Sequence, residues 1–186
     1  MQIETEIHFL EELREQNPKA QRMALERYGS YVFAQVARMV PGTENAEEVY
    51  QDVFIKVFRN IAMFDEQKSS LRTWISRIAY NEAVDWLRHK RQTVIYFEDW
   101  GDKAEELSEA EVEETFGHPN AEMVQLIRAA LKYLPPDERA VITMFYYEEM
   151  SLKEIAFVTE SVPTTVASKL SRTRKKICKI IQMLQS

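Results

Sequence analysis

Apolar residues recur every three or four positions along most of the chain, which is the spacing of one face of an α-helix. The clearest stripe lies in residues 45–61, where Asn45 and Glu48 have the spacing of an N-terminal capping box. Weaker stripes in residues 20–36 and 71–87 predict further helices. The members of the clearest stripe are Ala46, Val49, Tyr50, Val53, Phe54, Val57, Phe58 and Ile61. The N-terminal half is therefore predicted to be a bundle of helices.

The C-terminal half carries the same periodicity in shorter segments. One helix is predicted over residues 123–134, where Pro135 and Pro136 end it, and another over residues 141–146. No glycine lies beyond Gly117 in the sequence, which favours unbroken helices. The whole chain is thus predicted to be all-α.

The end of the chain has the pattern of a helix-turn-helix motif. Ser151 and Glu154 form a capping-box sequence that predicts a short helix, and Pro163 suits the first turn of a long one. In the long helix, Val166 and Leu170 are expected to face inward, against the short helix. A short helix, a tight turn and a long basic helix together predict a motif whose second helix enters the major groove of DNA.

An acidic stretch separates the two halves. Between Glu98 and Glu122 acidic residues are dense, aliphatic residues are few, and Lys103 is the only basic residue. Because like charges repel and so few apolar residues cannot form a core, a flexible linker is predicted. Residues 93–97 have strand propensity but no partner strand, so they are expected to begin the linker. The predicted organisation is a domain over residues 1–96, an acidic linker over 97–121 and a second domain over 122–186.

The composition predicts a folded cytoplasmic protein. The chain has 186 residues, of which 45% are hydrophobic and 29% charged, enough to form ordinary cores. No uncharged apolar run approaches the roughly 20 residues that span a bilayer, and the first residues lack a basic leader, so no membrane insertion is expected. The single cysteine, Cys178, cannot form an internal disulfide and is expected to be a packed thiol.

The formal net charge of -6 argues by itself against a nucleic-acid binder. The charge is, however, sorted along the chain. From Pro163 to Ser186 there are basic residues and no acid, and residues 68–91 are also predominantly basic. Each predicted domain therefore carries a basic segment suited to phosphate groups.

The polar side of the long helix is predicted to contact DNA. Base-edge contacts are expected from Thr164, Thr165, Ser168, Lys169 and Arg172, and phosphate contacts from Arg174, Lys175, Lys176 and Lys179. A solvated basic face on a plain helical hairpin is the alternative explanation.

The helix predicted over residues 71–87 and the polar loop before it combine basic, amide and aromatic groups. Aromatic rings stack on unpaired bases, amides bond base edges and cations hold the backbone, so the combination suits single-stranded nucleic acid. The polar loop spans residues 64–70, and the residues on the outward side of the helix are Arg72, Thr73, Arg77, Tyr80, Asn81 and Arg88.

No catalytic or metal centre is indicated by the sequence. None of the three histidines has a glutamate three residues before it, which a helical di-metal site would need. No glycine-rich phosphate loop and no nucleophile with an evident base is present. The chain is predicted not to be an enzyme and to need no cofactor.

These stretches together resemble the sigma-70 family of bacterial sigma factors, in particular its small extracytoplasmic-function (ECF) group. Residues 46–65 resemble region 2.2, residues 71–91 resemble regions 2.3 and 2.4, and residues 133–156 with 164–177 resemble region 4. The resemblance implies two helical domains that bind core RNA polymerase, recognise the minus-ten and minus-thirty-five elements of promoter DNA, and promote melting. The implied partners are core RNA polymerase, through its clamp helices and flap, and promoter DNA, and the free protein is expected to be a monomer.

The resemblance also implies roles for particular residues. The surface for the clamp helices falls on Glu48, Gln51, Asp52, Val53 and Lys56. The surface for the minus-thirty-five element is the outward side of the long helix. The surface for the minus-ten element is the loop of residues 64–70, with Phe64 and Lys68, and the adjoining helix, with Arg72, Thr73, Arg77, Asn81 and Arg88. Many members of the family are held by an anti-sigma factor, and candidates for such a contact are Tyr96, Phe97 and Trp100.

The linkers of the family occupy the RNA path of the polymerase, which implies the same for this acidic stretch. The acids concerned are Glu105, Glu106, Glu109, Glu111, Glu113 and Glu114, and a solvated spacer is the alternative. The chain departs from the family in the turn of the helix-turn-helix, where Glu160 replaces glycine or asparagine and Ser161 replaces an apolar residue.

Two other classes of function stay open at this point. A stand-alone helix-turn-helix regulator would bind duplex DNA unaided, usually as a dimer on a palindrome. A helical interaction protein that does not bind DNA would show affinities that barely change with salt.

Overall fold

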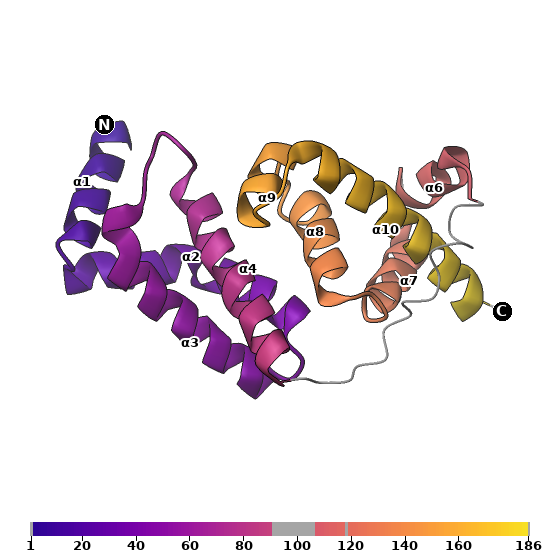
Figure 1. Ribbon diagram of the computed structural model, residues 1–186, viewed down its shortest axis with the longest axis horizontal. Coiled ribbons are helices and arrows are strands. Elements are labelled where there is room, and N and C mark those ends of the chain that lie inside the picture. The colour runs from indigo at the N-terminus through magenta and orange to yellow at the C-terminus, as the bar shows by residue number, and fades with distance from the viewer. Residues whose placement is uncertain (1, 91–106, 118, 186) are drawn as a thin grey trace. The chain divides into compact units, whose positions relative to one another are not determined.

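The computed structural model describes residues 2–90, 107–117 and 119–185, and Figure 1 labels its helices. The chain divides into two compact units. The first contains α1 (Gln2–Arg14), α2 (Pro18–Met39), α3 (Thr43–Asn60), the 3-10 turn η1 (Ile61–Met63) and α4 (Leu71–Lys90). The second is built on α6 (Glu109–Phe116), α7 (Ala121–Leu131), α8 (Pro136–Tyr146), α10 (Pro163–Leu184) and the greater part of α9 (Leu152–Val158). The described regular elements are helices, which confirms the all-α class; the expected strand-like segment 93–97 lies outside the described residues.

Helices α2, α3 and α4 pack against one another and form the core of the first unit. Figure 1 shows α3 and α4 lying side by side. Each helix contributes its predicted apolar stripe, and the core includes Val32, Val36, Val49, Val53, Val57, Ile75, Ala79 and Ala83. Full burial of a valine or isoleucine side chain contributes roughly 1.5–3 kcal/mol, so this core holds the three helices in place.

Local hydrogen bonds fix the reversal between α1 and α2. Gln16 ends α1 with a left-handed φ of 61°, and the Asn17 amide donates to the Glu12 carbonyl at 2.9 Å. The Asn17 side chain then caps α2 by accepting from the Lys19 amide at 2.9 Å. The residues by which α1 packs inward are Phe9, Leu10 and Leu13.

Helix α3 begins earlier than its capping pattern predicted. Its first residue is Thr43 and its cap is Gly42, whose φ of 87° is a conformation that glycine adopts without steric cost. The Asn45 side-chain amide instead donates to the Pro41 carbonyl at 2.8 Å. The prediction that Asn45 caps the helix was wrong because the turn at Pro41 and Gly42 already starts it.

The second unit is centred on α10, which packs against α7 and α8. Helices α7 and α8 correspond to the two segments predicted in this half. Helix α8 begins before the predicted segment, with Pro136 in its first turn. The large buried side chains here include Ile127, Leu134, Ile142, Met144, Ile155 and Ile177. The core of this unit is therefore separate from that of the first.

Helices α9 and α10 form the predicted helix-turn-helix. The Ser151 hydroxyl accepts from the Glu154 amide at 3.3 Å and the Glu154 carboxylate accepts from the Ser151 amide at 2.9 Å, which confirms the capping box. At the end of α9 the Ser161 amide donates to the Ala156 carbonyl at 2.9 Å, and Glu160 has a φ of 52°. This is a Schellman helix ending, in which the left-handed position is usually glycine.

Part of the predicted flexible linker is a packed helix. Ser108 caps α6, since its hydroxyl accepts from the Glu111 amide at 3.3 Å while the Glu111 carboxylate accepts from the Ser108 amide at 2.8 Å. The apolar side of α6 joins a small cluster whose members are Leu107, Val112, Phe116 and Cys178. The prediction failed over residues 107–116 because a few apolar residues at helical spacing suffice when a neighbouring helix supplies the rest of the core.

Cys178 is the packed thiol that the sequence predicted. It lies on α10 and is buried in the cluster with α6. Burial raises the pKa of this thiol, which disfavours the reactive thiolate.

Candidate nucleic-acid and partner interfaces

The outer side of α10 is open where base contacts were predicted. The exposed residues of the predicted set are Thr164, Thr165, Ser168 and Arg172. Val166 and Leu170 are buried, which confirms that they face inward. The Ser168 hydroxyl donates to the Thr164 carbonyl at 3.0 Å, and Arg172 Nε donates to the Ser168 carbonyl at 3.3 Å. We call this exposed surface the outer face of α10.

Two lysines of the predicted set are bound to the first turn of α8. Lys169 Nζ lies 2.8 Å from Asp137 Oδ2, and Lys176 Nζ lies 2.8 and 2.9 Å from the two Glu138 oxygens. The side chains of Lys176 and Glu138 are only 12% and 21% exposed. Such a shielded, doubly bonded pair is a structural link between helices. Lys175, also half-buried, lies one turn beyond Arg172 along the outer face.

Arg174 lies away from the outer face. At about 100° per helical residue it is about 200° around α10 from Arg172. Its guanidinium lies 3.0 Å from Glu113 and 5.3 Å from the centre of the Phe116 ring, both on α6. The side chain of Arg174 therefore lies on the side of α10 that holds α6, apart from the other residues predicted to contact DNA.

Arg77, Asn81 and Arg88 lie along one line of α4. Spacings of four and seven residues return to nearly the same side of a helix. Arg88 pairs with Asp85 and remains 70% exposed. Of the residues predicted to contact single-stranded DNA, these three are the ones that α4 places on one side. We call them the line on α4.

Arg72 belongs to a different side of α4. It lies about 140° around the helix from Arg77, and its guanidinium lies 4.3 Å from the centre of the Tyr31 ring on α2. The Tyr31 hydroxyl is in turn hydrogen-bonded to the Ser76 hydroxyl. Arg72 is thus an exposed residue that also contributes to the contact between α2 and α4.

Phe64 and Thr73 are buried, so neither side chain is open to its predicted contact with DNA in this structure. Phe64 is 5% exposed, and its ring centre lies 5.6 Å from that of Trp74. Thr73 is 2% exposed, and its hydroxyl lies 2.8 Å from the hydroxyl of Ser70, which also accepts the Thr73 amide hydrogen at 3.1 Å. Both side chains anchor the loop before α4, a role that residue type alone did not distinguish from binding.

Lys68 presents a well-exposed cation on that loop. Its side chain is 73% exposed and lies 3.2 Å from Asp65. The Gln67 amide donates to the Asp65 carboxylate at 3.0 Å, and this bond lowers the pKa of Asp65.

The predicted polymerase surface on α3 is mostly exposed. Glu48, Gln51 and Asp52 are exposed at helical spacing. Lys56 is 46% exposed and pairs with Glu82 of α4. These four side chains form one polar surface, which we call the α3 surface.

Val53 does not belong to the α3 surface. It is 0% exposed and continues the buried stripe of Val49 and Val57, so its side chain is not open to the predicted contact with a partner. Ile55, which the sequence pattern did not single out, is 52% exposed and lies one turn beyond Asp52. The available signal was that Ile55 falls between members of the apolar stripe rather than on it.

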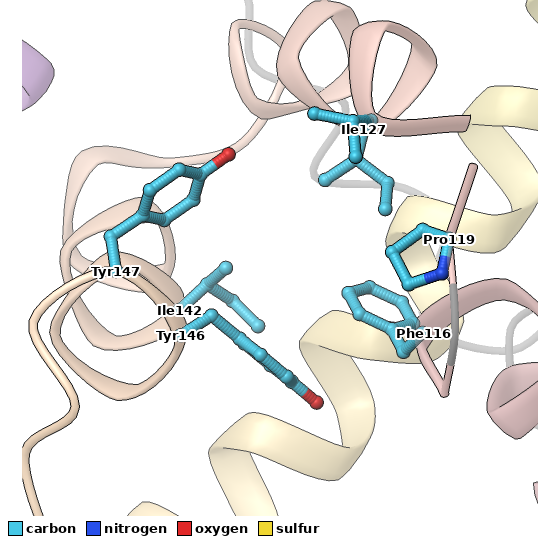
Figure 2. A pocket seen from close by; sticks show the side chains of 7 residues that line it. Phe116, Pro119, Ile127, Ile142, Tyr146 and Tyr147 are labelled. Carbon is cyan, nitrogen blue, oxygen red and sulfur yellow. The ribbon is translucent and has the colours of Figure 1, made fainter. Parts of the chain in front are cut away.

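An apolar pocket of about 210 Å³ opens in the second unit. Its lining consists of Phe116, Pro119, Val124, Ile127, Ile142, Tyr146 and Tyr147. Figure 2 shows Phe116 and Tyr146 together on one side of the pocket, and their ring centres are 5.3 Å apart. Sequence reasoning missed this pocket because its walls come from three helices and Pro119. Apolar walls of this kind fit a hydrophobic side chain of a partner.

Over residues 2–90, 107–117 and 119–185, no group of three or more histidine, cysteine, aspartate or glutamate residues is placed to hold a metal ion. Across the same described residues, no helix has both the length and the apolar character needed to cross a membrane. The candidate sites among the described residues are the α3 surface, the line on α4, the outer face of α10 and the pocket.

Both units correspond to known protein families. Residues 24–93 match Sigma-70 region 2, and residues 124–177 match Sigma-70, region 4. The chain belongs to the sigma-70 family, in its ECF group. Sigma factors are transcription initiation factors and not enzymes. The region 2 match contains the α3 surface and the line on α4, and the region 4 match contains the outer face of α10.

Curated relatives of this sigma factor extend over nearly its whole length. The RNA polymerase sigma-H factor of Pseudomonas aeruginosa is 28% identical, over 97% of this chain and 96% of that protein. The ECF RNA polymerase sigma-E factor of Escherichia coli K12 is 27% identical, over 95% of this chain and 94% of that protein.

Two solved structures show the same fold. The sigma factor RpoE from Bartonella quintana, in complex with the anti-sigma factor NepR, has a TM-score of 0.62 and 20% identity, covering 87% of this chain and 96% of that one. CnrH, in complex with the cytosolic domain of CnrY, has a TM-score of 0.62 and 22% identity, covering 94% of this chain and 96% of that one.

Proposed function

We propose that this sigma factor binds core RNA polymerase through the α3 surface, reads the minus-thirty-five element with the outer face of α10, and holds the melted minus-ten element along α4. The observation that carries the proposal is the open outer face of α10, with Thr164, Ser168 and Arg172 exposed while Val166 and Leu170 are buried. Short hydroxyl side chains and an arginine are suited to base edges in the major groove. Because transcription initiation takes place where RNA polymerase binds DNA, the proposed location is the cytoplasm.

The line on α4 supplies groups suited to an unpaired strand. Arg77 and Arg88 can neutralise phosphates, and Asn81 between them offers both a donor and an acceptor to a base edge. Lys68, on the loop before α4, is exposed enough to add a further phosphate contact. Binding energy given only to unpaired bases shifts the duplex toward the open form, so melting needs no covalent step.

The apolar pocket is proposed as the contact of the second unit with the flap of core RNA polymerase. Its aromatic wall and its volume of about 210 Å³ suit one large apolar side chain. Tyr147 lines this pocket and is 43% exposed, so Tyr147→Ser is expected to weaken polymerase binding without changing binding of the chain to duplex DNA.

The acids of the stretch before α7 are proposed to approach the RNA path of the polymerase. Glu114 is exposed and available for this role, whereas Glu113 is paired with Arg174. Glu105 and Glu106 lie outside the described residues, as do Tyr96, Phe97 and Trp100, which are proposed to contact an anti-sigma factor.

Run-off transcription tests the proposed function. Core polymerase with and without the chain is given a genomic fragment library, and new start sites are mapped. New starts that share two upstream motifs at a fixed spacing are the expected result. Binding of the chain alone to palindromic duplexes, with no new starts, would instead favour a stand-alone helix-turn-helix regulator.

A further inference from the structure

The ion pair between Lys169 and Asp137 lies at the edge of the outer face of α10. Lys169 follows Ser168, which is exposed on that face, and its ammonium lies 2.8 Å from the Asp137 carboxylate. Asp137 belongs to α8, 32 residues earlier in the chain. A cation predicted to contact DNA is therefore already bound to an acid of the same unit.

This pair is far more open than its neighbour. The Lys169 and Asp137 side chains are 32% and 46% exposed, against 12% and 21% for Lys176 and Glu138. Only one carboxylate oxygen of Asp137 contacts the ammonium, whereas both oxygens of Glu138 contact Lys176. A partly exposed, singly bonded pair of this kind contributes little stability and exchanges readily. Lys169 can thus leave Asp137, while Lys176 stays in place.

Asp137 places a carboxylate beside Lys169. It lies in the first turn of α8, where the partial positive charge of a helix N-terminus stabilises an anion. A carboxylate at the edge of a DNA-binding face repels phosphates and also holds the cation that would attract them. Both effects act against DNA binding.

We propose that Asp137 competes with promoter DNA for Lys169, so that the first turn of α8 restrains the affinity of α10 for DNA. This inference rests on the proposed function of the outer face of α10. Lys169 leaves Asp137 when a phosphate or a base-edge acceptor replaces the carboxylate. Asp137 is then a residue that sets promoter affinity without touching DNA itself.

The test compares Asp137→Asn with the wild-type chain, each assembled with core polymerase, on a promoter duplex found in the transcription experiment. Asparagine keeps the shape of aspartate and removes the charge. Promoter affinity is expected to rise about two- to fivefold in low salt, the range of an exposed ion pair. The gain should shrink as added salt screens both the pair and the phosphates. Weaker binding by Asp137→Asn would overturn the proposal, because it would mean that Asp137 positions Lys169 for DNA.

A double-mutant cycle separates competition for Lys169 from general repulsion. In a Lys169→Gln background, Asp137→Asn is expected to change promoter affinity by less than about 1.5-fold. An equal gain in both backgrounds would show that the carboxylate acts only through its charge, and the proposal would fail. Circular dichroism of each variant checks that the helices are intact.

Arg172→Ala distinguishes failure of this inference from failure of the proposed function. Arg172 is exposed on the outer face and is not part of the pair with Asp137. If Arg172→Ala weakens promoter binding while Asp137→Asn has no effect, the inference alone is wrong. If neither variant changes promoter binding, the outer face of α10 is not the DNA-binding surface.

Discussion

Basic residues of similar sequence context have different partners in this protein. Within the described residues, Arg172 bonds along its own helix to the Ser168 carbonyl, whereas Arg174, two residues later, is paired with Glu113 and stacked on Phe116. A cation that already has an anionic partner must lose that partner before it binds a phosphate, so its net contribution to DNA binding is smaller. Basic residues on the same helix therefore differ in function, because some side chains are open to DNA and others are paired within the protein.

Glu160 carries backbone strain in the turn of the helix-turn-helix. Its φ of 52° costs a residue with a Cβ about 1 kcal/mol relative to glycine. Glu160→Gly is expected to raise the free energy of unfolding of the second unit by about 0.5–1 kcal/mol, because relief of strain outweighs the added freedom of the unfolded chain. Urea unfolding followed by circular dichroism measures this, with Glu160→Ala as the control that keeps the strain. A loss of stability in Glu160→Gly would contradict the interpretation.

Ile55 is expected to be the apolar anchor of the α3 surface. It is 52% exposed in the free chain, and burial against a partner would contribute roughly 1–2 kcal/mol. Ile55→Ser should weaken binding to core polymerase about five- to thirtyfold without lowering stability. Ile7→Ser is the matched control, since Ile7 on α1 is 48% exposed. Fluorescence anisotropy with labelled protein measures both affinities, and equal effects of the two variants would contradict this role.

At the scale of elements, α6 is held by few contacts. It is eight residues long, and its contacts with α10 are the small cluster around Cys178, the ion pair of Glu113 with Arg174 and the stack of Arg174 on Phe116. A helix of this length is not stable alone in water. Helix α6 therefore keeps its helical structure only while it packs against α10. Helix α6 is thus expected to open more easily than α7, α8 or α10.

Cys178 reports this opening, because it is the only cysteine in the chain and is buried against α6. Glu113→Gln removes the ion pair with Arg174 and should raise the rate of thiol labelling of Cys178 about 1.5- to fivefold. Glu114→Gln is the matched control, since Glu114 is the next residue, is exposed and carries the same charge. Equal rates for the two variants, or labelling only at the rate of global unfolding, would contradict a separately opening α6.

At the scale of the whole molecule, a chain with a net charge of -6 binds a polyanion through sorted charge. Helix α10 carries basic residues and no acid, and residues 68–91, which contain the line on α4, are predominantly basic. Electrostatic attraction then acts locally, and its strength is read from the dependence of DNA affinity on salt.

The salt dependence of promoter binding should distinguish the basic residues of α10. Arg172→Ala is expected to lower the slope of log affinity against log salt concentration by about one, because one phosphate or base contact is lost. Arg174→Gln should leave that slope unchanged, since Arg174 lies against α6. Filter binding of the holoenzyme at several salt concentrations measures both, and a reduced slope for Arg174→Gln would contradict the assigned geometry.

Local sequence determined the helices and several of their ends. The stripe through Val49 and Val57 predicted α3, and the capping box of Ser151 and Glu154 predicted the start of α9, because these signals depend on residues within one or two helical turns. The same local patterns predicted the helix-turn-helix and carried the resemblance to sigma-70 regions 2 and 4. The start of α3 shows where such local prediction fails. Pro41 and Gly42, which precede Asn45, start the helix before the capping pair of Asn45 and Glu48 is reached.

Only the tertiary structure decided which side chains are available for binding. Arg174 and Glu113 are 61 residues apart in the chain, and Lys176 and Glu138 are 38 apart, so no local pattern reveals that they pair. The docking of α6 likewise depends on apolar surface that α10 supplies from a distant part of the sequence. Helix periodicity is set by short-range hydrogen bonding and sterics, whereas charge pairing and burial depend on how the helices pack, and these long-range contacts separate the residues free to bind DNA and polymerase from those that hold the fold.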